Sequence, residues 1–311
     1  MALELNPLRA GGKRPAGVLN IAHRGARAFA PENTLAAFEK ARHFGCRMFE
    51  LDVHLSKDGE LIVHHDDQLT RCTDVRVKFP GRGRYAVADF TGDELRRLDA
   101  GSWYVDQLAL PADRRQGFLQ GLADEEREQF VSARDMARYA SGEIGLPTLQ
   151  QALELARREE LMVNIELKSL PCMYPGMAEA VVELVEWLGM ESRVLVSSFD
   201  HEQLVSVRRR SDCIATGVLT GDRLAKPAAY LELLDADAYH PNTDAMGLNS
   251  LTRKLDPCGI IDVLAANRAV NVWTCNDKDQ MRQLIAAGVS GVISDFPNRV
   301  RAVLLASEQN D

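Results

Sequence analysis

The fold of this chain is restricted most by a repeated alternation of short, β-branched apolar runs with longer segments of helical periodicity. Such alternation is typical of βαβ units around a parallel sheet, and so of an α/β protein. Strands are expected at Val18–His23, Arg47–Val53, Leu161–Leu167, Arg193–Ser197, Cys213–Val218, Asp237–His240, Ala269–Thr274 and Gly291–Asp295. Helices are expected at Pro31–Phe44, Thr148–Glu159, Gly176–Leu188, His201–Arg210, Pro257–Arg268, Asp277–Ala287 and Pro297–Ala306.

Eight strands, each leading to a helix, favour a closed (β/α)8 TIM barrel over an open doubly wound sheet, although the strand count alone leaves both open. No GxGxxG motif follows the first strand, which removes the commonest sign of a dinucleotide-binding sheet. Leaving the 36 residues 106–141 and the 17 residues before Val18 out of 311 gives 258, near the ~250 typical of this barrel. We therefore expect a single barrel domain over residues 18–311.

Two segments depart from the repeat. Asp58-Gly59 has the composition of a hairpin turn, so Leu61–His64 is expected to form a short extra strand after the second barrel strand. Residues 106–141 are charged, and within them Asp124–Tyr139 is expected to be an amphipathic helix. Its expected apolar stripe is Phe130, Ala133, Ala137 and Ala140. We expect this insertion to lie above the barrel mouth as a lid, with an oligomer contact or a neutral surface decoration as the alternative.

The formal net charge of −8 argues against a protein that coats nucleic acid, because such proteins carry a basic patch. The N-terminal segment MALELNPLRAGGKRPAG lacks the apolar run of a secretory signal, and no apolar stretch is long enough to cross a bilayer. We expect a cytoplasmic protein with no nucleic-acid partner and no stable membrane insertion. The sequence has no marker of oligomeric state, so a homo-oligomer stays open.

Polar side chains stand at the ends of several expected strands, where a barrel keeps its active site. They are His23-Arg24 after the first strand, Glu50 and Asp52 on the second, His65-Asp66 after the hairpin, and Glu166 with Lys168 on the third. Glu50 and Asp52 point to the same side of their strand and repel each other unless they are protonated or neutralised. A divalent cation would neutralise them, with Glu166 as a third oxygen ligand. Oxygen ligands favour Mg²⁺ or Ca²⁺ over zinc.

Each of these residues also has a plain structural interpretation. The three carboxylates can be ion-paired to arginines in a polar layer of the barrel, and His23 can be a hydrogen-bonded core histidine. Residues 31–34, Pro-Glu-Asn-Thr, have the composition of a helix start, and Asp66 can be only a turn residue. The joint occurrence of these groups favours a functional site more than any one of them.

Six motifs run along the chain from about Ile21 to Pro297: HRGARAFAPENTLAAFEKA, FELDVHLSKDGELIVHHDD, LPTLQQALELA, NIELK, VNVWTCND and GVSGVISDFP. In content and order they closely resemble the glycerophosphodiester phosphodiesterases, most specifically in the first eighty residues. The resemblance explains residues 106–141 least. It implies a metal-dependent TIM-barrel enzyme that hydrolyses a small glycerophosphodiester to glycerol phosphate and an alcohol.

The resemblance gives each strand-end group a role. The acid–base pair is His23 and His65, the metal ligands are Glu50, Asp52 and Glu166, and the phosphate is bound by Arg24 with Lys168 as a basic partner. One divalent cation, Mg²⁺ or Ca²⁺, is implied. The family usually has an apolar residue where this chain has His64. Strand alternation puts His64 and His65 on opposite faces, so only one of them can face the site. The register of the family motif favours His65 as the catalyst.

Three further residues are weaker candidates. Trp273 ends the seventh strand and is expected either to line a glycerol pocket or to pack in the core with a satisfied N–H group. His240 lies near the end of the sixth strand. Asp295 precedes Phe296-Pro297 and is expected to be a helix cap more than a ligand.

The implied chemistry needs one histidine to remove a proton and the other to donate one, which suits an unperturbed pKa of ~6.5. The nucleophile is the substrate's own glycerol hydroxyl or a metal-activated water, and both routes stay open. Two rival functions remain. One is a related phospholipase D-like barrel enzyme that acts on lipid, which the acidic balance and the missing secretory signal disfavour. The other is a non-catalytic phosphodiester-binding module, which has no need of the full set of residues.

Overall fold

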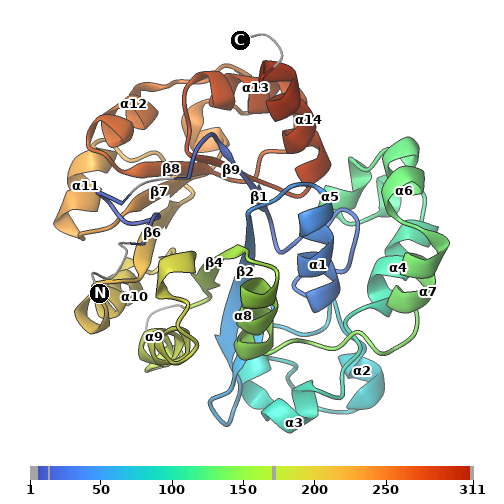
Figure 1. The fold of residues 1–311 in the computed structure, drawn as a ribbon. Helices are drawn as coiled ribbons and strands as arrows, with labels where there is room; N and C mark the ends of the chain where they lie inside the picture. The colour runs from blue at the N-terminus through green and yellow to red at the C-terminus, as the bar shows by residue number, and fades with distance from the viewer. Residues whose placement is uncertain (1–5, 13–14, 170–172, 309–311) are drawn as a thin grey trace.

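The computed structural model describes residues 6–12, 15–169 and 173–308, and within them eight parallel strands form a closed barrel (Figure 1). These strands are β1 (Leu19–Ala22), β2 (Met48–Leu55), β4 (Met162–Leu167), β5 (Val194–Ser198), β6 (Ala215–Thr220), β7 (Ala238–Pro241), β8 (Ala269–Val272) and β9 (Gly291–Ser294). The ring closes because β1 pairs in parallel with both β2 and β9. The expected TIM barrel is therefore confirmed, with a strand at each of the eight expected places.

Helices connect the strands and cover the outside of the barrel (Figure 1). They are α1 (Leu35–His43), α8 (Leu149–Arg158), α9 (Met177–Trp187), α10 (His201–Arg210), α11 (Pro227–Leu233), α12 (Cys258–Ala265), α13 (Lys278–Ala286) and α14 (Pro297–Glu308). The expected set lacks α11. This helix has only seven residues, and its N-cap side chain makes no capping hydrogen bond, so neither periodicity nor a cap signals it.

The hairpin expected around Asp58-Gly59 is present. Strand β3 (Leu61–Val63) pairs antiparallel with the outer half of β2, and Gly59 has the positive φ of 86° that such a turn uses. The pairing continues past β3, because the His64 backbone N–H donates to the Asp52 carbonyl at 3.1 Å. The hairpin thereby brings residues 64–66 back to the end of β2 where the acidic side chains lie.

The long connection from β3 to β4 carries several short helices. They are α2 (Val75–Lys78), α3 (Gly92–Leu95), α4 (Ser102–Ala109), α5 (Gly117–Gln120), α6 (Asp124–Phe130) and α7 (Ala133–Tyr139). The single helix expected over Asp124–Tyr139 is wrong. Val131 is extended and Ser132 starts a new helix through a capping box with Asp135, so two helices replace one.

The apolar stripe expected on that helix is also largely wrong. Phe130 is partly buried, but Ala133, Ala137 and Ala140 are exposed, and Val131 and Tyr139 are buried instead. The break between the two helices rotates α7 relative to α6, which explains the different buried face. Apolar periodicity identifies the buried face of a segment only when the segment forms one continuous helix.

The segment 102–139 packs beside the β1–α1 connection and α1 itself, as Figure 1 shows. The Tyr104 hydroxyl donates to the Ala28 carbonyl at 2.7 Å, and the Tyr139 hydroxyl donates to the Phe29 carbonyl at 3.3 Å. Lys40 Nζ of α1 donates to Asp135 Oδ2 at 2.7 Å. These contacts fix the loop that follows β1, which matters because that loop carries part of the site.

Toward the amino ends of the strands, the barrel interior is largely apolar, with His240 and Asn271 as buried polar exceptions. Its side chains include Leu19, Ile21, Met48, Ile293, Leu195, Ala215 and Ala238. Polar side chains replace them toward the carboxyl ends of the strands, where Glu50, Asp52 and Glu166 lie. No helix in the described part of the chain combines the length and the apolar character needed to span a membrane.

Candidate active site

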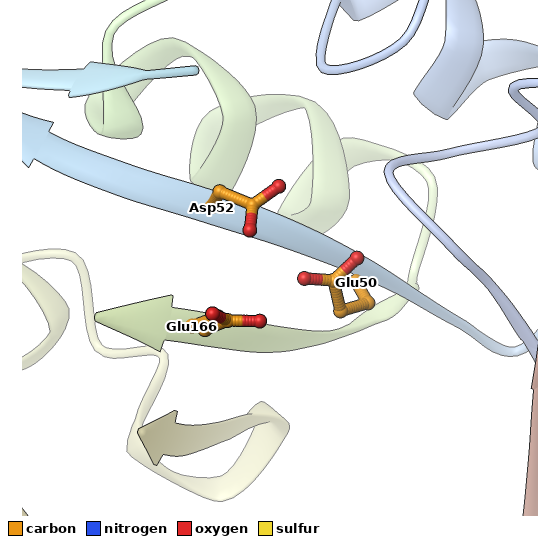
Figure 2. Close-up of side chains that lie close together, drawn as sticks. All are labelled: Glu50, Asp52 and Glu166. Carbon is orange, nitrogen blue, oxygen red and sulfur yellow. The ribbon is translucent and has the colours of Figure 1, made fainter. Parts of the chain in front are cut away.

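Three carboxylates converge at the carboxyl ends of β2 and β4. Asp52 stands directly opposite Glu166 in the parallel register, and Glu50 lies two residues earlier on β2, so all three point to one side (Figure 2). One oxygen from each residue lies within 4.8 Å of the others. All three side chains are buried, with residue exposures of 3%, 1% and 9% for Glu50, Asp52 and Glu166. The structure therefore brings together the acidic residues singled out in the sequence.

These carboxylates are poorly satisfied by the protein alone. Burial raises the pKa of Glu50 well above its ordinary value, and repulsion from Asp52 and Glu166 adds to the rise. Glu50 Oε1 and Asp52 Oδ1 are buried oxygens that have no hydrogen-bond partner among the described residues. Buried anionic oxygens without donors are costly, and a divalent cation would offset that cost. The donor set is all oxygen, which fits Mg²⁺ or Ca²⁺.

Arg24 lies beside this cluster in a strained turn. Its φ is 53°, and its backbone N–H donates to Glu50 Oε2 at 2.8 Å. Its Nε lies 3.4 Å from Asp52 Oδ2 and has no hydrogen-bond partner in the described chain. The next residue, Gly25, must be glycine because its φ is 76° and a Cβ would lie 2.6 Å from the Ala37 carbonyl carbon. The close approach of this turn to α1 thus positions the arginine.

His23 is oriented by Asp295. Its Nδ1 lies 2.6 Å from Asp295 Oδ1, and its Nε2 lies 3.9 Å from Glu50 Oε2. Burial lowers the pKa of His23 to about 4, with further lowering by Arg27 and Arg24. Arg27 holds the pKa of Asp295 far below its ordinary value in spite of burial, so this carboxylate accepts the Nδ1 proton. His23 is consequently neutral at pH 7, with the lone pair of Nε2 facing the acidic cluster.

Asp295, for which the sequence favoured a helix cap, lies beside His23 in the candidate site, and its side chain bonds Arg27 and Asn276. Its two oxygens accept from Arg27 Nε at 2.5 Å and Arg27 Nη2 at 3.1 Å, and Asn276 Nδ2 donates to it at 2.7 Å. A signal for this role was present, since Asp295 directly follows β9 just as His23 follows β1. Neighbouring parallel strands bring such positions together.

His65 has a similar environment after the β2–β3 hairpin. Its Nδ1 lies 2.6 Å from Asp66 Oδ1, and Arg71 donates to both oxygens of Asp66 through Nε at 2.5 Å and Nη2 at 3.0 Å. His65 is close enough to Asp52 to help lower its pKa against the effect of burial, and close enough to Glu166 to oppose the rise that burial causes in the pKa of that residue. Asp66 is therefore more than a turn residue.

Two neighbouring histidines have supporting positions. His54 Nε2 lies 3.1 Å from the His65 carbonyl oxygen, and its Nδ1 lies 3.1 Å from the Tyr174 hydroxyl. His64 is buried, with Nε2 3.3 Å from the Gln68 carbonyl oxygen. Burial lowers the pKa of His54 to about 3 and also lowers that of His64. The sequence does not identify His54, because its contact with the His65 backbone appears only in the folded chain.

Lys168 and Asn33 complete the surroundings of the carboxylates. Lys168 Nζ lies 2.8 Å from Glu166 Oε1 and 3.7 Å from Asp52 Oδ1. Asn33 Nδ2 donates to Asp52 Oδ2 at 2.7 Å. Asn33 belongs to the Pro-Glu-Asn-Thr segment, for which a plain helix start was one interpretation of the sequence. Thr34 does cap α1, but the residues before it enter the site.

Trp273 lies on the barrel rim, and the structure pairs it with Phe199. Their rings are 5.4 Å apart in an edge-to-face arrangement, the Trp273 N–H donates to the His240 carbonyl at 2.8 Å, and Phe199 is 46% exposed. The His240 ring is buried against Asn271 at 2.9 Å, and burial lowers its pKa to about 3. His240 makes no contact with the carboxylate cluster among the described residues and belongs to the barrel interior.

Comparison with known proteins gives a consistent result. The model of the glycerophosphoryl diester phosphodiesterase family matches residues 23–299. A glycerophosphodiester phosphodiesterase of Bacillus altitudinis is 34% identical over 281 residues, covering 90% of this chain and 95% of the relative. The range matched by the family model includes every residue of the site described above.

Solved structures agree. An Oleispira antarctica phosphodiesterase in complex with the product sn-glycerol-3-phosphate has a TM-score of 0.68 at 28% identity, covering 91% of this chain and 95% of that one. A Silicibacter pomeroyi structure shares the fold at a TM-score of 0.76 and 24% identity, with 98% of each chain covered. These findings confirm the resemblance in the sequence motifs. The chain belongs to the glycerophosphoryl diester phosphodiesterase family.

Proposed function

We propose that this chain hydrolyses small glycerophosphodiesters to glycerol phosphate and an alcohol, with one divalent cation and with His23 and His65 as the acid–base pair. The observation that carries the proposal is the convergence of both histidines on one buried acidic cluster beside Arg24. Each histidine has its Nδ1 atom on a carboxylate. Such a pair is what phosphodiester hydrolysis needs.

Glu50, Asp52 and Glu166 would hold the cation. Their buried and partly unpaired oxygens fit Mg²⁺ or Ca²⁺. When bound, the cation would neutralise charge on the phosphate and favour ionisation of the attacking hydroxyl. Asn33 and Lys168 keep Asp52 and Glu166 in place through their hydrogen bonds. A bound cation would relieve the repulsion among the three carboxylates, and this relief would strengthen cation binding.

Arg24 and Lys168 would bind the phosphate. Arg24 Nε is buried beside Asp52 with no hydrogen-bond partner in the described chain, so a donor is available for a non-bridging oxygen. Lys168 stays protonated, because Glu166 and Asp52 raise its pKa although burial opposes this. Two cationic side chains thereby flank the place where negative charge increases during the reaction.

His23 is suited to accept a proton, because it is neutral at pH 7 and Asp295 fixes the tautomer with a lone pair on Nε2. Asp66 orients the His65 ring through its Nδ1 atom, which places His65 to donate a proton to the departing alkoxide. The proton taken by His23 comes from the attacking hydroxyl, either on the glycerol of the substrate or on water. A glycerol hydroxyl would give a cyclic phosphate, which water then opens with the histidine roles reversed.

Small substrates are favoured by two observations. The Oleispira antarctica relative binds sn-glycerol-3-phosphate, and the Phe199–Trp273 pair offers aromatic faces suited to the C–H surface of a glycerol. The segment 106–141 would act as a lid by limiting access for long acyl chains. It also reaches the site's arginines, because the Arg27 guanidinium lies 4.1 Å from the centre of the Phe118 ring.

The test is an assay of alcohol release from glycerophosphocholine, glycerophosphoethanolamine and a lysophospholipid, with saturating Mg²⁺ or Ca²⁺ and with EDTA. We expect metal-dependent turnover of the first two substrates. Turnover of the lysophospholipid alone would favour the lipid enzyme. Binding of glycerophosphocholine with no turnover under any metal condition would favour the non-catalytic module and refute the proposal.

A further inference from the structure

Glu32 is a buried carboxylate that contacts three arginines of the described chain. Its Oε1 accepts from Arg24 Nη1 at 3.0 Å and from Arg71 Nη2 at 2.7 Å, and its Oε2 accepts from Arg27 Nη1 at 3.4 Å. The residue is 5% exposed. Burial alone would raise the pKa of Glu32, but the three arginines outweigh burial and hold it well below its ordinary value. Glu32 is therefore an anion at neutral pH.

Two of these arginines lead to different histidines. Arg27 donates to both oxygens of Asp295, and Asp295 bonds Nδ1 of His23 at 2.6 Å. Arg71 and Asp66 repeat the pattern on the other side, because Arg71 donates to both oxygens of Asp66. Asp66 bonds Nδ1 of His65 at 2.6 Å.

The contacts thus form one continuous network that runs from the first histidine to the second. In order, its members are His23, Asp295, Arg27, Glu32, Arg71, Asp66 and His65. Glu32 is its central member. The third arginine, Arg24, branches from the same carboxylate toward Asp52.

Charge makes Glu32 hard to replace within this network. Arg24, Arg27 and Arg71 each face a second carboxylate, those of Asp52, Asp295 and Asp66 in turn, and among the described residues they share Glu32. Removing the charge of Glu32 leaves three guanidinium groups without the anion that they share. The arginine side chains would then reorient toward the remaining carboxylates or solvent, and Asp295 and Asp66 would move with them.

Helix formation does not explain Glu32. The N-terminus of α1 is capped by the Thr34 side chain, which accepts from the Ala37 N–H at 3.3 Å. The Glu32 carboxylate points to the arginines and not to the free N–H groups of α1. A glutamate at this position is therefore available for a role in the site.

We propose that Glu32 is a positioning residue that couples the two histidine–aspartate pairs, so that His23 and His65 keep their orientations together. It touches neither the substrate nor the cation. The inference rests on the proposed paired-histidine function. It extends that function, because it makes the orientations of the acid and the base depend on one hydrogen-bond network.

The principal variant is Glu32→Gln, which keeps the size of the side chain but replaces one acceptor oxygen with an NH₂ donor facing arginine N–H groups. A matched control is Asp237→Asn. Asp237 is also buried, at 1% exposure, and also contacts two arginines, Arg208 at 2.8 Å and Arg9 at 3.3 Å. It lies directly before β7, at the opposite end of the barrel from the carboxylate cluster. Both variants lose a buried carboxylate, so loss of stability alone would affect them alike.

With glycerophosphocholine we expect Glu32→Gln to lower kcat by about 10–100-fold with a smaller change in KM, the range typical when an outer partner of a site residue is lost. Asp237→Asn should keep kcat within about twofold of wild type. A nitrophenyl diester, whose leaving group needs no protonation, should show a smaller loss for Glu32→Gln. Equal losses in kcat for the two variants would overturn the inference.

Coupling is tested by double-mutant cycles on glycerophosphocholine, because the proposed mechanism uses both histidines on this substrate. If Glu32 acts through the histidines, Glu32→Gln should cost less in the His23→Ala and His65→Ala backgrounds than in wild type. The same fold loss in all three backgrounds would mean an independent effect on stability or phosphate binding and would refute the coupling. An inactive wild type would instead refute the proposed function, so the two failures are distinguishable.

A second measurement does not depend on activity. Protons in short histidine–aspartate hydrogen bonds resonate at low field in proton NMR, and metal-free wild type should show one for each pair. Both resonances should shift or vanish in Glu32→Gln and persist in Asp237→Asn. Unchanged resonances in folded Glu32→Gln would refute the inference.

If Glu32→Gln does not fold, Arg71→Lys replaces it, since the Arg71 side chain is 30% exposed. A lysine cannot contact both Asp66 oxygens and Glu32 at once. The resonance of the His65–Asp66 pair should then change and kcat should fall at least about tenfold. Wild-type kcat in Arg71→Lys would overturn the coupling.

Discussion

His23 Nδ1 and Asp295 Oδ1 lie 2.6 Å apart although the two residues are separated by 272 positions in the chain. The carboxylate fixes which nitrogen of the imidazole carries the proton. Asp295→Asn should therefore lower kcat by about 10²–10⁴-fold, the usual contribution of a positioned acid or base, because the amide can present its NH₂ group to Nδ1 and select the wrong tautomer. Steady-state kinetics on glycerophosphocholine checks this. Retained kcat in a folded Asp295→Asn protein would show that the pair is only structural.

Glu50→Gln is expected to have different effects on thermal stability in the absence and in the presence of metal. In chelator, Glu50→Gln should keep or raise the thermal midpoint, because it removes a carboxylate that Asp52 and Glu166 repel. The rise in midpoint caused by Mg²⁺ or Ca²⁺ should shrink, since a lost charged contact of ~1.5 kcal/mol or more weakens binding about tenfold. Glu126→Gln, at a carboxylate paired with Arg299, is the control. A full metal-induced rise in Glu50→Gln would refute the ligand assignment.

Substitution of His23, His64 and His65 tests whether His65, and not His64, is the second catalytic histidine. His23→Ala and His65→Ala should each lower kcat by about 10²–10⁴-fold. His64→Ala should change kcat far less, because His64 Nε2 faces the Gln68 carbonyl and not the carboxylate cluster. Circular dichroism melts would confirm that each variant is folded. A loss at His64 equal to that at His65 would exchange their assigned roles.

Buried neutral histidines predict a loss of stability on acidification. The pKa of His240 is lowered to about 3 by burial, whereas an unfolded chain has a histidine pKa of ~6.5. Below pH ~6.5 the unfolded state takes up a proton that the folded state does not, so this part of the stability is present above that pH and is lost toward pH 3. The slope is about 1.4 kcal/mol per pH unit for each such group.

Urea unfolding of metal-free protein at pH 7, 6 and 5 measures this effect. His240→Gln removes one titrating group and should reduce the dependence between pH 6 and 5 by about 1.4 kcal/mol. Ala133→Ser, on the exposed face of α7, changes no titrating group and is the control. Parallel pH profiles for wild type and His240→Gln would contradict the prediction.

Single substitutions within residues 106–141 test the role of this segment more specifically than its removal does. Gln116 Oε1 accepts from Arg71 Nη1 at 3.0 Å, and the Phe118 ring covers Arg27, so replacing the whole segment would disturb both histidine pairs. Phe118→Leu should lower kcat several-fold, because an aromatic–guanidinium contact contributes ~0.5–2 kcal/mol. Ala133→Ser, on the exposed face of α7, should have no effect.

The lid role is judged by selectivity. A Gly/Ser linker in place of residues 106–141 should lower kcat and also raise the relative kcat/KM for bulky diesters. Lower kcat with an unchanged ratio between small and bulky diesters would leave the segment a support for the arginines only.

The barrel could be predicted from the sequence because each strand and most helices have their own periodicity. The carboxylates, Arg24 and both histidines could be located because each lies on or just after a strand and in a motif. Asp295 and Glu32 were harder to assign, since their roles come from contacts with residues on distant elements. Glu32 also sits where a helix start offers a sufficient explanation. The break at Val131-Ser132 was missed because a four-residue capping box looks like ordinary helix polarity.

Closure of the barrel between β1 and β9 has a consequence for how the protein acquires its site during synthesis. The first of the site's groups leaves the ribosome at residue 23 and the last at residue 295. A nascent chain that ends before β9 contains both histidines, but it lacks the carboxylate that orients His23 and the strand that pairs with β1. Most of the chain must therefore be made before the barrel can close and His23 can be oriented. A fragment that ends before β9 lacks both features and should not turn over the proposed substrate.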